Sequence, residues 1–119
     1  KIFSKDFAIT GEEDIFPFIC ASDAVICNNS TVIYQVVLAK KPLVLYPWKR
    51  FDSYHAELYA PYIPLLYSDK EVVETLTKIF SDSAYHNELL RKQEEFLKGY
   101  MFDGKSSQRV ADFLKNLAL

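Results

Sequence analysis

Glycine is scarce in this chain, with three among 119 residues, and no Gly-rich fingerprint of the dinucleotide or P-loop type is present. No apolar run approaches the roughly 20 residues that span a bilayer, and no signal peptide opens the chain. Acidic and basic residues nearly balance, 16 against 14, without a basic stripe, which argues against a general nucleic-acid binder. We therefore expect a globular protein with no nucleic-acid partner.

Cysteine is also rare. Cys20 and Cys27 are the two cysteines; both lie inside apolar segments and lack the spacing of metal ligands. We predict two buried, reduced thiols of an intracellular domain. Half of the residues are apolar and a quarter charged, enough for one domain with a single core over residues 1–119. The chain starts at Lys1 rather than Met, and we expect a piece of a longer protein.

Two short, continuously apolar runs, Ala24–Cys27 and Leu43–Tyr46, are typical of strands buried on both faces of a parallel sheet. Such strands need a crossover, and Thr31–Ala39 is either that crossover or a third strand. Its β-branched residues favour the strand. We predict a helix, because the polar residues Asn28–Ser30 are good N-caps and Pro42 follows shortly after.

This prediction puts residues 28–31 at the carboxyl end of a strand and the amino end of a helix. Backbone N–H groups and the helix dipole favour a phosphate there, and the side chains of Asn29, Ser30 and Thr31 add donors. The alternative is that these residues only cap a buried helix and bind nothing.

The segment Pro47–Ala60 has no clean period and follows a strand, so we predict a loop at the rim where open α/β sheets bind ligands. Trp48, Lys49 and Arg50 are its candidate binding residues; alternatively its aromatic side chains pack over the sheet edge and its cations form a solvated turn. We interpret the lone His55 as a surface residue rather than a base.

Other elements complete an α/β pattern. We expect a strand in the latter half of Ile2–Thr10, a helix over Ile15–Ala21 and a short edge strand over Tyr62–Tyr67. Two helices follow, one from the capping box at Ser68–Glu71 to Ser81 and one over Ala84–Met101. Their order predicts an open, mostly parallel, Rossmann-like sheet with flanking helices.

After a turn at residues 102–107, a terminal helix carries the apolar positions Val110, Phe113, Leu114 and Leu117. We expect the helices at this end to fold back over the sheet. Asp103, Ser107 and Arg109 give this turn more polar groups than it needs, and they are either ligand contacts or an exposed helix cap.

Two stretches together resemble a known family. ASDAVICNNSTVIYQVVLAKKPLVLYP resembles the carboxyl-terminal domain of GT-B glycosyltransferases, where a strand, small polar residues, a helix, Lys-Pro and a strand follow one another. FDGKSSQRVADFL resembles the ending of CDP-glycerol glycerophosphotransferases and related surface-polysaccharide transferases. The resemblance covers roughly Glu13 to Leu117. It implies half of a GT-B architecture, a domain that binds the nucleotide diphosphate of a donor.

The resemblance also assigns roles by position. Ser30 and Thr31 would hold the donor phosphates, and Gln35 stands where many relatives have a ribose-binding Glu. Trp48, Lys49 and Arg50 occupy a loop that approaches the donor, and the second motif would face the same cleft through Asp103, Ser107 and Arg109.

The implied chemistry is displacement at an anomeric carbon or a phosphorus, with a nucleotide leaving. The family usually acts without a bound metal, and we expect neither metal nor cofactor. The partners would be a UDP- or CDP-activated sugar or polyol and a polymer or lipid-linked acceptor held by a missing amino-terminal domain. That domain would supply the base, so no catalytic residue is named. We expect a cytoplasmic location and leave open peripheral attachment at the inner membrane face.

Two other interpretations stay open. One is the corresponding half of a UDP-N-acetylglucosamine 2-epimerase, which shares the fold but needs a base for carbon 2. The other is a small α/β interaction module that uses its Tyr-rich loop to bind a protein.

Overall fold

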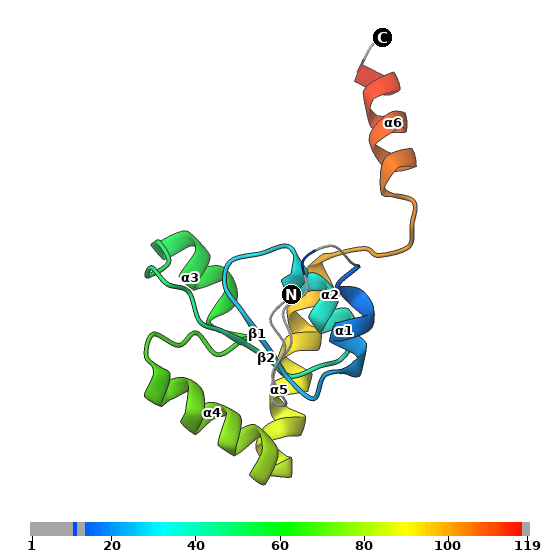
Figure 1. Cartoon of the computed structure of the whole chain (residues 1–119). Coiled ribbons are helices and arrows are strands. Elements are labelled where there is room, and N and C mark those ends of the chain that lie inside the picture. The colour runs from blue at the N-terminus through cyan, green and yellow to red at the C-terminus, as the bar shows by residue number, and fades with distance from the viewer. Residues whose placement is uncertain (1–10, 12–13, 118–119) are drawn as a thin grey trace.

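The computed structural model describes residue 11 and residues 14–117. Six α-helices, two strands and a 3-10 helix follow one another (Figure 1) in the order α1 (Phe16–Ala21), β1 (Val25–Cys27), α2 (Val32–Leu38), β2 (Leu43–Leu45), α3 (Ser53–Tyr59), α4 (Asp69–Ser81), α5 (Ser83–Phe96), η1 (Leu97–Gly99) and α6 (Ser106–Leu117). The α/β class is confirmed. The strand expected within Ile2–Thr10 lies outside the described residues.

The two strands pair in parallel, with Val25 opposite Leu43 and Cys27 opposite Leu45. Parallel pairing requires a crossover, and α2 is that crossover, so the helix prediction is confirmed over the alternative strand. The edge strand predicted over Tyr62–Tyr67 is wrong: within the described part of the chain this segment makes one isolated bridge, between Leu45 and Leu65. Pro61 and Pro64 remove two backbone donors there, which limits a ladder.

β2 is fully buried on both faces, as predicted. Leu43 and Leu45 belong to a core cluster shared with α1, α2 and α5, while Val44 belongs to a second cluster formed with α4 and α5. β1 differs from the prediction, because Ile26 is 50% exposed. The second cluster covers β2 but not the neighbouring Ile26. The prediction of buried thiols is also wrong, since Cys20 is exposed and Cys27 half-buried.

The end of α2 is a Schellman motif. The N–H of Lys40 donates to the carbonyl of Val37 at 3.0 Å, and the N–H of Lys41 donates to the carbonyl of Val36 at 3.2 Å. Lys40 has a left-handed φ of 54°, at a position where glycine is usual. The turn brings the chain to Pro42 and directly into β2.

The segment predicted as a loop over Pro47–Ala60 contains α3, so that prediction is wrong. The side chain of Asp52 caps this helix by accepting the backbone N–H of His55 at 2.9 Å. The sequence signal for this helix is the capping aspartate, which the loop prediction missed. Tyr59 packs into the first core cluster, whereas Trp48 and Tyr54 stay exposed.

The capping box at the start of α4 is confirmed. Ser68 Oγ accepts the N–H of Glu71 at 3.3 Å and donates to Glu71 Oε2 at 3.0 Å. Val72 and Ile79 are buried on this helix, while Val73 and Phe80 are exposed. The next helix is shorter than predicted: α5 ends at Phe96, and η1 continues it to Gly99.

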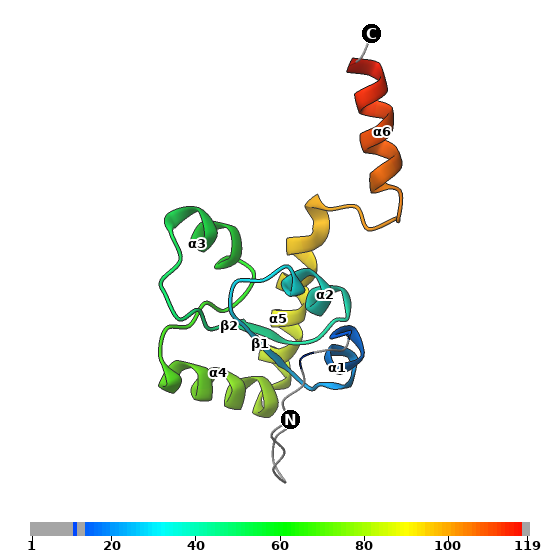
Figure 2. The same cartoon turned by 45° about the horizontal axis from the view of Figure 1, so that its top comes forward.

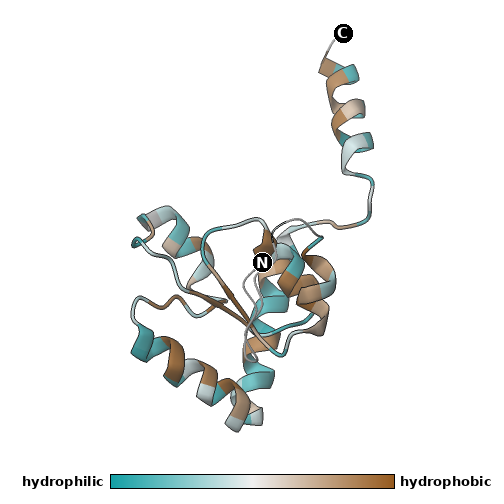
Figure 3. Cartoon of the chain, viewed as in Figure 1, coloured by the Kyte–Doolittle hydropathy of each residue, from teal (hydrophilic) through white to brown (hydrophobic). Residues whose placement is uncertain are grey.

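The terminal helix forms where predicted, but it does not fold back over the sheet. α6 stands away from the other elements at the end of an extended connection, and a view turned by 45° shows the same separation (Figures 1 and 2). Hydrophobic residues lie along α6 (Figure 3), and four of them are more than half exposed, Val110, Phe113, Leu114 and Leu117. Periodicity predicted their shared face but could not predict what covers it. No helix in the described ranges is long and apolar enough to cross a membrane.

Candidate functional site

An open hollow of about 350 Å³ lies at the carboxyl ends of the two strands. Asn28 and Asn29, directly after β1, line it from one side, and residues 48–52 with His55 line it from the other. Carboxyl ends of parallel strands meet at one edge of a sheet, so two short connections far apart in sequence share this space. This is the place where open α/β sheets bind ligands.

Trp48 also lines a second hollow. The second hollow has a volume of about 430 Å³ and is lined by Asn28, Tyr46, Pro47, Trp48 and Tyr67. The Trp48 side chain is 89% exposed, so it contributes almost nothing to the core. An exposed indole that lines two hollows offers a flat face on which an aromatic ligand can stack.

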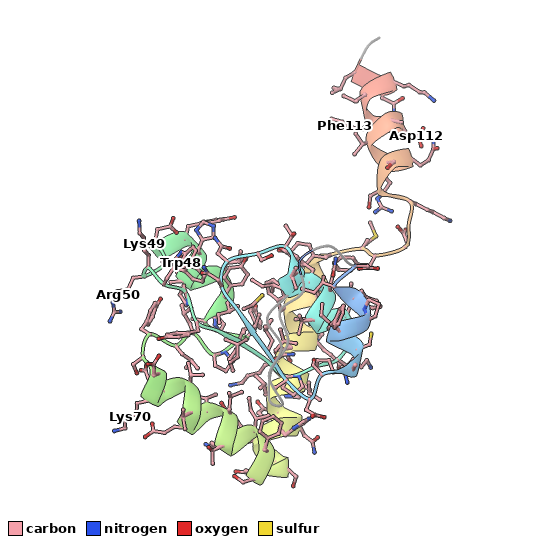
Figure 4. The ribbon with its side chains drawn as sticks, in the orientation of Figure 1. Trp48, Lys49, Arg50, Lys70, Asp112 and Phe113 are labelled. Atoms are coloured by element: carbon pink, nitrogen blue, oxygen red, sulfur yellow. The ribbon has the colours of Figure 1, made fainter. Side chains whose placement is uncertain are left out.

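Two cations flank the indole. Figure 4 shows Trp48, Lys49 and Arg50 together beside α3, with the cationic ends pointing outward. Arg50 lies over the ring of Tyr67, 4.5 Å from its centre. Among residues 14–117, neither Lys49 nor Arg50 forms an ion pair with a carboxylate. Both charges therefore remain available to an anion.

A histidine and an aspartate complete the hollow. His55 Nδ1 lies 2.8 Å from Asp52 Oδ1, the same oxygen that accepts the His55 backbone N–H. Hydrogen bonds from the backbone and then the ring of His55 lower the pKa of Asp52. His55, expected from the sequence to be a surface residue rather than a base, thus has a carboxylate partner. The Asp-x-x-His spacing at a helix start is the sequence signal from which this pair could have been predicted.

The predicted phosphate site at the start of α2 is only partly organised as expected. The cap position is Thr31, without a side-chain cap bond, and Ser30 Oγ accepts the N–H of Val32 at 3.2 Å. Asn29 lines the first hollow, whereas Ser30, Thr31 and Gln35 line neither of the two hollows. Gln35 is exposed on α2.

The structure does not bring the second motif to this hollow. Arg109 Nη1 donates to both carboxylate oxygens of Asp103, at 2.9 and 2.8 Å, and Nη2 donates to Ser106 Oγ at 3.1 Å. The Arg109 hydrogen bonds, followed by the N–H of Lys105, lower the pKa of Asp103. Ser107 is exposed at the start of α6, the helix that carries the labelled Asp112 and Phe113 far from Trp48 in Figure 4.

No group of three or more His, Cys, Asp and Glu residues in the described ranges is arranged to hold a metal ion. The polar groups of the hollow are amides, two cations and one His–Asp pair. Such groups suit the binding of an anion, particularly a phosphate.

Comparison with known proteins decides the family. Residues 4–116 match the family described as CDP-Glycerol:Poly(glycerophosphate) glycerophosphotransferase. The chain belongs to this glycerophosphotransferase family. The resemblance to the glycerophosphotransferases stated from the sequence is thereby confirmed, whereas the resemblance to a GT-B carboxyl-terminal domain stays a prediction.

A curated relative is the teichoic acid ribitol-phosphate primase of Bacillus spizizenii (strain ATCC 23059 / NRRL B-14472 / W23), which is 30% identical over 116 residues. The alignment covers 91% of this chain but 28% of the relative, so the chain spans little more than a quarter of that protein. No solved structure gives a significant match.

Proposed function

We propose that this chain is the donor-binding domain of a transferase that moves a polyol-phosphate or sugar from a nucleotide-activated donor to a growing cell-surface polymer of the teichoic acid, capsule or lipopolysaccharide type. The observation that carries the proposal is the hollow at the strand ends, where Trp48, Lys49 and Arg50 stand exposed beside Asn29. An aromatic face next to two cations that have no carboxylate partner within residues 14–117 fits a nucleoside diphosphate, which has one aromatic end and one anionic end.

In this proposal the phosphates lie against Lys49, Arg50 and Asn29, and the base stacks on Trp48. Ser30 and Thr31 follow Asn29 in sequence and contribute hydroxyl groups from the start of α2, and Gln35 contacts the ribose. Asp103, Ser107 and Arg109 stay in the proposal as a second motif, on the condition that α6 moves toward the strand ends when the acceptor domain is present. The domain is then the Rossmann-like half of a GT-B architecture.

The reaction we propose is a displacement at phosphorus for a polyol-phosphate donor. An acceptor hydroxyl oxygen bonds to the phosphorus, the bond to the bridging oxygen breaks, and the nucleotide leaves with that electron pair. Negative charge grows on the leaving phosphate, so fixed cations such as Lys49 and Arg50 stabilise the transition state more than the ground state. The hydroxyl proton goes to a base that we assign to the amino-terminal domain. The location in this proposal is cytoplasmic, with peripheral attachment at the inner membrane face left open.

An amide-shift NMR titration of the chain with UDP, CDP, GDP and inorganic phosphate tests the proposal. Saturable shifts at residues 28–35 and 46–55, with one base preferred, are the expected result. The same titration of Trp48→Ala separates the two ends of the ligand: it should weaken nucleotide binding but not phosphate binding. Absence of shifts for every nucleotide at millimolar concentration would contradict a donor site in this chain.

A further inference from the structure

His55 is one of the residues that line the hollow at the strand ends, and its ring is fixed by Asp52. We propose that His55 is a pH-dependent cationic contact for the phosphates of the nucleotide donor, with Asp52 as its positioning residue. This inference rests on the proposed function and deepens it, because it names a further residue that contacts the donor in the same site.

The Asp52 contact fixes which ring nitrogen remains for a ligand. A carboxylate accepts hydrogen bonds, so Nδ1 of His55, 2.8 Å from Asp52 Oδ1, carries a hydrogen. The other nitrogen, Nε2, then has a lone pair in the neutral ring and an N–H in the charged ring. A lone pair repels a phosphate oxygen, whereas an N–H of an imidazolium donates to it. One protonation therefore converts Nε2 from a repulsive into an attractive group.

The ring is also held by its neighbours. The centre of the Phe51 ring lies 5.9 Å from that of His55, and Tyr54 meets the imidazole edge to face at 5.4 Å. The His55 side chain is nevertheless 36% exposed. A ring confined by two aromatic neighbours loses little further freedom when a ligand binds, and it remains accessible from the hollow.

The charges around the hollow make this protonation significant. Lys49 and Arg50 carry positive charge, Asp52 carries negative charge, and Asn28 and Asn29 are neutral. These charges sum to one positive unit while His55 is neutral and to two when it is protonated. A nucleoside diphosphate should therefore bind more tightly when the imidazole carries a charge than when it is neutral.

The alternative is that the pair serves only to cap α3, since the backbone N–H of His55 shares the same Asp52 oxygen. Asp52→Asn distinguishes the two roles. Asparagine caps helices as well as aspartate does, but its amide does not stabilise an imidazolium. If the pair acts on the ligand, this variant retains the melting temperature of the wild type and loses part of the pH dependence of binding.

The decisive measurement is the affinity of the full chain for CDP at about pH 5.5 and about pH 8, in wild type, His55→Gln and His86→Gln. His86 is the matched control, because the chain has two histidines and this one lies on α5, with Nδ1 3.3 Å from the carbonyl of Ile79. The phosphate of CDP titrates in the same range, and that effect is common to all three proteins.

We expect the gain in affinity at low pH to be about 3- to 10-fold larger in wild type and His86→Gln than in His55→Gln. An unchanged pH dependence in His55→Gln overturns the inference and leaves the donor site intact. An equal loss of affinity at both pH values also overturns it, because the contact would not depend on the proton. Failure of all three proteins to bind CDP at either pH overturns the proposed function together with the inference.

Discussion

Gln93 on α5 joins the helix to the start of β2 through both ends of its amide. Its Oε1 accepts the backbone N–H of Leu43 at 2.9 Å, and its Nε2 donates to the carbonyl of Lys41 at 2.8 Å. The side chain is 1% exposed. Farther along β2, Leu45 bonds to Pro64 and Leu66 on the same edge. Among the elements that the structure describes, the amide thus occupies the place of a neighbouring strand at this end of β2.

Replacement of this amide should be costly. Gln93→Leu introduces an apolar side chain of similar size and leaves the buried N–H of Leu43 and the part-buried carbonyl of Lys41 without their partner, each at about 1–3 kcal/mol. We expect a loss of about 2–4 kcal/mol in the free energy of unfolding, measured by urea denaturation. Gln108→Leu on exposed α6 is the control and should change stability by less than about 0.5 kcal/mol. Equal effects of the two substitutions would contradict the buried contact.

The sequence predicts local structure better than long-range contacts in this chain. The unit from β1 to β2 followed from apolar runs, N-cap residues and a proline, all features that act over a few residues. Gln93 carries no such signal, since its partners lie about fifty positions earlier in the chain. The same limit explains α6, whose amphipathic pattern is local while the surface that would cover it is not.

Lys40 offers a test of backbone strain. Its left-handed φ of 54° suits glycine better than lysine, because a Cβ crowds the carbonyl in that region. Lys40→Gly should raise the free energy of unfolding by about 0.5–1 kcal/mol, even though it removes an exposed ion pair with Glu94. Lys41→Gly is the matched control: its φ is not in that region, so added chain freedom should lower stability. A stabilisation by both variants would point to charge removal instead.

Two phenylalanines test the separation of α6 from the core. Phe96 is buried and stacks on Tyr34, with ring centres 5.5 Å apart, whereas Phe113 is exposed on α6. Phe96→Ala should lower the free energy of unfolding by about 3–5 kcal/mol, and Phe113→Ala by less than about 0.5 kcal/mol. Thermal melts of both variants provide the measurement. A large loss from Phe113→Ala would show that α6 packs against the core in solution.

The structure brings some of the predicted site residues to one hollow and leaves others away from it. The loop after β2 was expected at the rim of the sheet, and the structure places Trp48, Lys49 and Arg50 there beside Asn29. The second motif was expected to face the same cleft, yet Asp103 and Arg109 bind each other at the base of α6. Sequence similarity indicates that two motifs belong to one family, but the position of a helix depends on the surface that it contacts.

The ion pair of Asp103 and Arg109 predicts a pH dependence at the start of α6. The folded pKa of Asp103 is lowered by the Arg109 hydrogen bonds, so the pair stabilises the turn above the ordinary aspartate pKa. That stabilisation is lost as the pH falls through the lowered pKa. Side-chain NMR should show the lowered pKa in wild type and a return toward the ordinary value in Arg109→Gln. Arg91→Gln on α5, which removes two other exposed ion pairs, should leave the Asp103 titration unchanged.

Lys49 and Arg50 test whether the hollow binds phosphate. Each should contribute a charge-assisted contact to the donor phosphates, so Lys49→Gln and Arg50→Gln should each weaken CDP binding about 3- to 10-fold. Cytidine, which has no phosphate, should bind all variants alike. Lys70→Gln is the matched control, because it removes the same charge from an exposed position on α4 that is labelled in Figure 4. Loss of affinity for CDP in all three variants, declining together with added salt, would indicate general electrostatic attraction rather than a defined phosphate contact.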